Sequence, residues 1–154
     1  MDRNKDFTNS CEEKDWTLMT EFTANATFFT SCYRRPKYDH VDCYAERNDK
    51  KYNVELKSRD MSHTEHNAYF LECDKYAELR RNSDNGYTPL YINFFSDGYT
   101  AIWCVDPNKG GINVGKPRKI ISTDPSTGLQ EKTAKYLLPI SKAVIYNSTY
   151  TKVQ

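Results

Sequence analysis

Val41-Asp42-Cys43-Tyr44-Ala45-Glu46 and Tyr52-Asn53-Val54-Glu55-Leu56-Lys57 are the two stretches that decide how this chain folds. In both, apolar residues alternate with polar ones, which is typical of β-strands with one buried face. The segment between them is short and polar, with Asn48-Asp49 near its centre. The two stretches therefore predict a β-hairpin that turns at Asn48-Asp49.

The register of this hairpin follows from the turn. With Asn48-Asp49 at its centre, Asp42 lies directly opposite Glu55 in an antiparallel pair. Val41 then pairs with Leu56 and Cys43 with Val54, so that the apolar side chains share one face. A shift by one residue would turn Glu55 or Lys57 toward the core instead.

The polar face of the hairpin brings together two carboxylates and one amine. Asp42 and Glu55 repel each other when they are directly opposite, and a divalent cation between them would relieve that repulsion. Lys57 lies two residues after Glu55 and therefore points to the same face. The pattern predicts a metal site with a lysine beside it.

Asp42, followed after a hairpin-length gap by Glu55-Leu56-Lys57, resembles the motif of the PD-(D/E)xK nuclease superfamily. Its members include type II restriction enzymes, Holliday-junction resolvases and many phage-encoded endonucleases. The bare E-x-K pattern also occurs at Glu12-Glu13-Lys14. The match at Glu55 is distinguished by its β-type neighbours, by the acid opposite and by a helical segment on either side.

The resemblance implies an α/β fold with a restriction-endonuclease-like core, in which helices flank a central mixed β-sheet, and a single domain over residues 1–154. It implies a metal-dependent endonuclease that hydrolyses phosphodiester bonds in DNA, with Mg²⁺ or Mn²⁺ as cofactor. The expected location is the cytoplasm of a bacterial or phage-infected cell, and homodimerisation is an option.

The resemblance also assigns roles to residues. Asp42 and Glu55 would bind the metal together with the backbone carbonyl of Leu56, and Lys57 would hold the attacking water or stabilise the transition state. Glu21 would be an additional metal-associated glutamate, although an ordinary exposed helix glutamate explains it equally well. Asp39 is the second choice for the first ligand.

Contacts to nucleic acid are expected from basic side chains, because the net charge of +1 says little by itself. Four basic clusters occur along the chain: Arg34-Arg35-Pro36-Lys37, Lys50-Lys51, Arg80-Arg81 and Lys116-Pro117-Arg118-Lys119. The residues expected to contact DNA are Arg34, Arg35, Lys37, Arg59 and Lys75. For Lys75 the alternative is a surface pair with Glu72 on the same helix.

The remaining elements follow from periodicity and turn signals. Helices are expected after Ser10-x-x-Glu13 and from Ser62-x-x-Glu65 to Arg81, since both patterns match capping boxes. A second hairpin, with strands 90–95 and 99–105, turns at Asp97-Gly98. A polar loop covers 106–118, short apolar segments follow near 119–121, 136–138 and 143–146, and the Glu55 and Leu90 strands are expected to be parallel.

The composition limits the classes of protein to which this chain can belong. A chain of 154 residues can bury a sizeable core as one domain. The five cysteines are scattered and odd in number, which favours reduced thiols over disulfides or a zinc site, and no apolar run is long enough for a membrane span. Two alternatives remain: an inactive nucleic-acid-binding domain of the same fold, and a virion-associated interaction domain that uses the 12 tyrosines.

Overall fold

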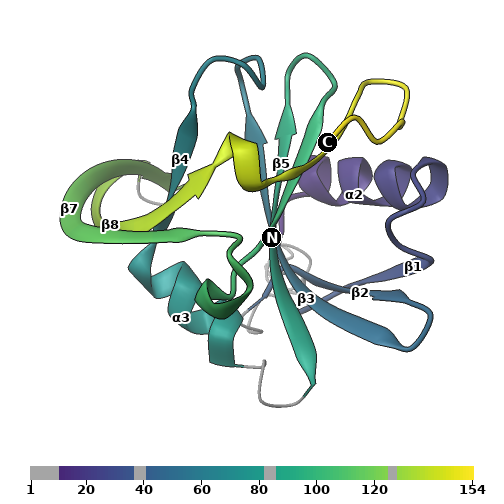
Figure 1. Cartoon of the computed structure of the whole chain (residues 1–154), viewed down its shortest axis with the longest axis horizontal. Helices are drawn as coiled ribbons and strands as arrows, with labels where there is room; N and C mark the ends of the chain where they lie inside the picture. The colour runs from purple at the N-terminus through teal and green to yellow at the C-terminus, as the bar shows by residue number, and fades with distance from the viewer. Residues whose placement is uncertain (1–10, 37–40, 82–85, 125–127) are drawn as a thin grey trace, which may run out of the picture.

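The computed structural model describes residues 11–36, 41–81, 86–124 and 128–154. Within these ranges the chain forms two β-sheets and two α-helices (Figure 1). The larger sheet has six strands in the order β1 (Ser31–Arg34), β2 (Cys43–Arg47), β3 (Lys50–Arg59), β5 (Tyr87–Phe95), β6 (Thr100–Cys104) and β9 (Val144–Tyr146). The smaller sheet has three strands in the order β4 (Ala68–Glu72), β8 (Gly128–Pro139) and β7 (Asn113–Asp124).

The six-stranded sheet is mixed, as predicted. Strands β3 and β5 run parallel, from Lys51 beside Tyr87 to Arg59 beside Phe95, and its other neighbouring pairs are antiparallel. The parallel pair requires a crossover, which contains β4 and helix α3 (Cys73–Arg81). The expected α/β fold, with helices flanking a central mixed sheet, is confirmed.

The β2–β3 hairpin has the predicted register. Cys43 pairs with Val54 and Arg47 with Lys50, which places the turn at Asn48-Asp49. Asn48 has a positive φ of 55°, a conformation that asparagine tolerates well in hairpin turns. The second hairpin, β5–β6, is also confirmed, with a positive φ of 85° at Gly98.

One part of the hairpin prediction is wrong. Val41 does not pack beside Leu56, because β2 begins only at Cys43. Its neighbour Asp42 donates its N–H to the Val54 carbonyl and accepts from the N–H of Arg35, so the chain has left the regular ladder there. Val41 packs with Trp103 and Tyr91 in one apolar cluster, whereas Leu56 packs in another.

These two clusters cover opposite faces of the six-stranded sheet. Helix α2 (Glu13–Asn25) packs Met19 and Phe22 against Val54 and Leu56. The other face carries Trp103 and is covered by the smaller sheet and α3. Figure 1 shows α2 on one side of the sheet and β7, β8 and α3 on the other. Because both faces are covered, Glu55 is buried and only 6% exposed, although alternation had predicted an open polar face.

The second predicted helix is half wrong. Residues 68–72 form strand β4, which pairs with β8, and the helix begins only at Cys73. Tyr69 and Leu71 alternate into the core, which favours a strand once a partner is present. Ser62 caps no helix, since its hydroxyl donates to the carboxylate of Asp97 at 3.0 Å.

Two further boundaries differ from the sequence prediction. The expected loop over 106–118 contains a 3-10 turn, η2 (Pro107–Lys109), and the start of β7; a second turn, η3 (Ile140–Lys142), precedes β9. Ser10 lies outside the described residues, and α2 is preceded by Glu12, which makes no side-chain capping bond. All five cysteines are free thiols. Within the described ranges, no helix is long and apolar enough to cross a membrane.

Candidate active site

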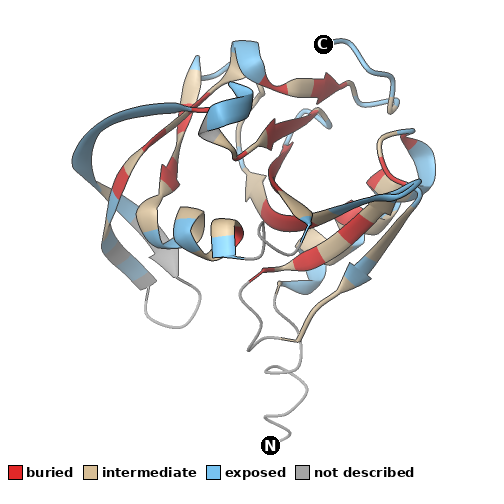
Figure 2. Ribbon diagram, turned by 60° about the horizontal axis from the view of Figure 1, so that its bottom comes forward, coloured by how far each residue is buried: buried red, intermediate tan, exposed pale blue. Residues whose placement is uncertain are grey.

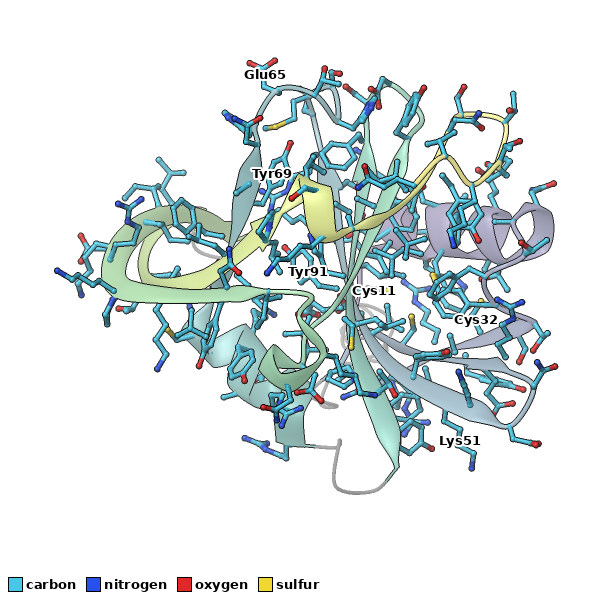
Figure 3. The ribbon with its side chains drawn as sticks, in the orientation of Figure 1. Cys11, Cys32, Lys51, Glu65, Tyr69 and Tyr91 are labelled. Carbon is cyan, nitrogen blue, oxygen red and sulfur yellow. The ribbon has the colours of Figure 1, made fainter. Side chains whose placement is uncertain are left out.

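A cleft of about 770 Å³ lies beside the end of the β2–β3 hairpin. Its walls include Asp42, Glu55, Leu56 and Lys57 from the hairpin side and Lys75 from α3. The ribbon of β7 and β8 forms another wall through Ile120, Ile121 and Lys132. Figure 3 labels three more lining residues, Cys11, Tyr69 and Tyr91. The structure therefore brings the predicted acids and lysine together in one cleft.

Asp42 and Glu55 lie within hydrogen-bonding reach of each other. The Leu56 N–H donates to Oδ2 of Asp42 at 2.8 Å, which orients that carboxylate. Burial raises the pKa of the Asp42 carboxyl well above its usual range, and repulsion from the Glu55 carboxylate raises this pKa further. The two carboxylates therefore repel each other when both are ionised, and binding of a cation or a proton would reduce this repulsion.

Lys75 is the amine in contact with this pair. Its Nζ lies 3.2 Å from Oε2 of Glu55, and its side chain is 45% exposed. The Glu55 carboxylate raises the pKa of the Lys75 ammonium above its usual range, so Lys75 is charged at neutral pH. The alternative pairing of Lys75 with Glu72 is wrong, since its ionic partner is Glu55. Lys57 lines the cleft from the same strand as Glu55 and is half-buried.

Arg59 also lines the cleft, two residues after Lys57 on β3. Its guanidinium lies 5.0 Å from the centre of the Tyr69 ring, at a distance typical of a cation–π contact. Arg59 is thus held at the cleft wall by an aromatic residue of β4.

Several predicted residues lie elsewhere. Glu21 is exposed on α2 and does not line the cleft, whereas Glu12 and Asp15, from the other end of that helical region, do. Arg34 binds Glu13 at 2.8 Å and the Cys11 carbonyl at 2.7 Å, and Arg35 lies 4.5 Å from the Tyr44 ring centre. Neither arginine lines the cleft.

Lys37 and Asp39 lie outside the described residues. Asp42, in contrast, lies beside Glu55 as predicted, although the regular β2–β3 ladder ends at Cys43.

Sequence reasoning missed residues that reach the cleft from distant segments. Asp15 of α2 accepts a hydrogen bond from the Ser58 hydroxyl, which ties the helix to β3. Tyr91 of β5 lies beside Glu55 in the parallel pair, and burial raises the pKa of its hydroxyl to about 12. The only available signal for Tyr91 was the predicted parallel pairing of the two strands.

The donor set fits a hard divalent cation. Two adjacent carboxylates in a partly buried cleft supply oxygen ligands, and when both are ionised one negative charge remains after pairing with Lys75. Across the described ranges, no group of three or more His, Cys, Asp or Glu side chains could hold a metal. The two carboxylates therefore suit an ion such as Mg²⁺, which keeps several water ligands, and do not suit an ion that needs protein ligands alone.

The segment His63-Thr64-Glu65-His66 contains two histidines, but in the described ranges they belong to no group of side chains that could hold a metal. Nδ1 of His63 lies 2.7 Å from Oδ2 of Asp97, and the ring stacks on Tyr99 at 3.8 Å. These contacts join the loop before β4 to the β5–β6 turn.

The fold and the cleft define an α/β protein with the restriction-endonuclease-like fold, in which a mixed sheet holds paired acids beside a cleft. The Holliday junction resolvase Hjc of the archaeal hyperthermophile Archaeoglobus fulgidus has a similar structure, with a TM-score of 0.53. The match covers 84% of this chain and 87% of the resolvase, at 13% sequence identity. No family model and no curated protein matches the sequence. At this identity the likeness establishes the fold alone.

Proposed function

We propose that this protein is a metal-dependent endonuclease that hydrolyses phosphodiester bonds in DNA, and that it is a PD-(D/E)xK nuclease with one catalytic domain over residues 1–154. The observation that carries the proposal is the Asp42–Glu55 carboxylate pair, held at a cleft with Lys57 and Lys75. A fold shared with a Holliday junction resolvase supports the same activity.

Asp42, Glu55 and the Leu56 carbonyl are the groups that would hold Mg²⁺ or Mn²⁺. When bound, the ion would acidify a water and offset charge on the scissile phosphate. Asp42 must be ionised to act as a ligand, so its raised pKa implies weaker cation binding as the pH falls.

The chain's own cations would position the substrate. Lys57 lines the cleft from the strand that carries Glu55, where its ammonium can hold a phosphate oxygen or the attacking water. Lys75 neutralises and orients Glu55 through its 3.2 Å contact. Arg59, at the same wall, supplies a further positive charge for the nucleic-acid backbone.

The test is cleavage of supercoiled plasmid and of a four-way DNA junction, with EDTA or with millimolar Mg²⁺ or Mn²⁺. The wild type is expected to cut only with metal, and Asp42→Ala and Lys57→Ala are expected to lower the rate at least 100-fold, on the order expected for lost electrostatic catalysis. The matched controls are Asp49→Ala in the hairpin turn and Lys152→Ala near the C-terminus. Both side chains are exposed and outside the cleft, so both variants should cut at the wild-type rate.

Wild-type cleavage by purified Asp42→Ala would reject the site. Salt-dependent DNA binding without cleavage would favour an inactive binding domain of the same fold. Absence of both binding and cleavage would favour an interaction domain. A parallel assay on RNA of the same sequence decides which nucleic acid is cut.

A further inference from the structure

Strand β7 contains an irregularity that the proposed nuclease site does not use. Val114 pairs with Tyr136 and Arg118 with Ala134, so Gly115-Lys116-Pro117 is opposite Lys135 alone. Surplus residues on one strand form a β-bulge, which re-aims the side chains around it. Pro117 suits this place because it has no N–H to donate to a ladder.

The bulge borders a hollow of about 250 Å³. Phe70, Gly115, Lys116, Pro117, Arg118, Lys135 and Leu137 line it. The lining thus contains three cationic side chains and no acid. Arg118 lies 5.0 Å from the centre of the Phe70 ring, which holds its guanidinium over the hollow's aromatic wall.

The neighbouring lysines of strands β7 and β8 form ion pairs with acids, whereas, among the described residues, the basic residues of the hollow do not. Lys119 lies 3.4 Å from Glu131, and Lys132 lies 3.4 Å from Asp74. Lys116, Arg118 and Lys135 form no ion pair with any acid in the described part of the chain. Lys116 and Arg118 are also exposed, and Figure 2 draws much of the β7 ribbon in pale blue. Positive charge is therefore concentrated at the bulge.

The hollow adjoins the cleft. Phe70 lines both, and Ile120 and Ile121, which follow the bulge on β7, line the cleft.

We propose that the β7 bulge is a phosphate-binding anchor, which contacts the backbone of the DNA substrate near the phosphate in the cleft. This inference rests on the proposed nuclease function. Three cations without an acid suit a phosphate, and the wall that the hollow shares with the cleft suits a second phosphate of the same polymer. Base stacking does not suit the hollow, because the Arg118 guanidinium already lies over the Phe70 ring.

The first experiment measures affinity for a DNA duplex without divalent metal, at several salt concentrations. Lys116→Gln/Arg118→Gln is compared with Arg47→Gln/Lys152→Gln, which removes one arginine and one lysine from exposed positions outside both cavities. The bulge variant should lose about 1.8 from the slope of log K against log salt, at roughly 0.9 for each phosphate contact. The control should keep the wild-type slope, and Lys116→Arg/Arg118→Lys should restore it.

The second experiment locates the contact. Duplexes with a single neutral methylphosphonate, placed in turn at each position on either side of the cleavage site, are bound by the wild type and by the bulge variant. One position near the cut, other than the scissile phosphate itself, should weaken the wild type and leave the bulge variant unaffected, since the two changes remove the same contact.

The outcomes separate this inference from the proposed function. If the wild type cuts DNA but the bulge variant keeps its salt slope, the anchor is rejected and the nuclease stands. If the bulge variant melts several degrees lower and the charge-retaining swap fails to restore the slope, the bulge serves folding and the anchor is rejected. If the wild type neither binds nor cuts DNA, both proposals fail.

Discussion

At the scale of single residues, the contacts at the site join two carboxyl groups to one ammonium group. Asp42 and Glu55 bring two negative charges into contact, and Lys75 offsets only one of them. The Leu56 N–H stabilises Asp42, but burial and the repulsion from Glu55 outweigh it, because the pKa of Asp42 is raised. We therefore expect the folded protein to be less stable at neutral pH than it would be with a neutral side chain at this position.

The first prediction concerns Asp42→Asn. The asparagine oxygen can still accept the Leu56 N–H, while the repulsion from Glu55 is removed. Without metal at neutral pH, the variant should be more stable than the wild type by on the order of 1 kcal/mol, or roughly 2–4 °C in melting temperature. Thermal unfolding in EDTA measures this, with Asp49→Asn as the exposed control.

The pH dependence of this variant follows from linkage. The pKa of Asp42 is higher in the folded than in the unfolded chain, so folding favours the proton. The contribution of Asp42 is fully present below its unfolded pKa of about 3.8 and is lost as the pH rises through the raised folded value. The advantage of Asp42→Asn should therefore grow as the pH rises from about 4. If the difference in unfolding free energy between Asp42→Asn and the wild type stays constant as the pH rises from about 4, the pKa of Asp42 is not raised in the folded protein.

The second prediction concerns Lys75. Lys75→Met leaves the Glu55 carboxylate, only 7% exposed, without its ionic partner. Breaking a fully buried pair costs about 3–5 kcal/mol, but Lys75 is 45% exposed, and solvent screening reduces the expected loss to about 1–2 kcal/mol. Urea unfolding measures the loss. Lys75→Arg keeps the charge and should lose less, and equal stability of all three proteins would show that the pair is not stabilising.

At the scale of elements, the cleft exists because two sheets meet. One contact between them is specific: Trp103 of β6 donates its indole N–H to the carbonyl of Pro139, at the end of β8, at 2.8 Å. Trp103 is fully buried, and Tyr69 of β4 packs against it with ring centres 6.2 Å apart. This tryptophan helps to hold the three-stranded sheet, and thus one wall of the cleft, against the six-stranded sheet.

The third prediction is that Trp103→Phe destabilises the fold by about 2–4 kcal/mol. The change removes a buried ring and leaves the Pro139 carbonyl without its donor. Trp16→Phe is the control, because Trp16 is half-buried on α2 and belongs to the other apolar cluster. Urea unfolding followed by circular dichroism should show a clearly smaller loss for the control. Equal losses would mean that the sheet-to-sheet hydrogen bond contributes little.

At the scale of the whole molecule, metal binding at the proposed site would be linked to folding. The hairpin, α3 and β5 must assemble before Asp42, Glu55 and Lys75 meet, so the unfolded chain has no equivalent site. A cation that binds only the folded state raises its stability in proportion to the logarithm of its concentration.

The fourth prediction is that millimolar Mn²⁺ or Mg²⁺ raises the melting temperature of the wild type. At a concentration 100 times the dissociation constant, the gain is about 2.7 kcal/mol. Glu55→Gln removes one of the two carboxylate ligands and should shrink the shift, whereas Asp49→Asn should keep it. An undiminished shift in Glu55→Gln would place the cation elsewhere on the molecule.

Local signals explain what was predictable about the fold. The β2–β3 hairpin combines alternation with a turn at Asn48-Asp49, and the β5–β6 hairpin combines two apolar stretches with the Asp97-Gly98 turn, so the signals for each lie close together in the chain. Strand β4 was mistaken for a helix because Tyr69 and Leu71 alternate into the core only when β8, more than sixty residues later, supplies the partner strand. The exposed ribbon of β7 carried too few apolar residues to reveal a strand from 113 onward.

The sequence by itself determined the hairpin register from Cys43 opposite Val54 to Arg47 opposite Lys50, because turn geometry and a period of two act over neighbouring residues. Asp42 lies just past the end of this ladder, where it meets Glu55. The tertiary structure alone decided that Glu55 is buried, that Lys75 is its ionic partner, and that the β7 bulge adjoins the cleft. These contacts join segments far apart in the chain. Their geometry depends on how two sheets and a helix pack, and no local pattern of residues encodes that packing.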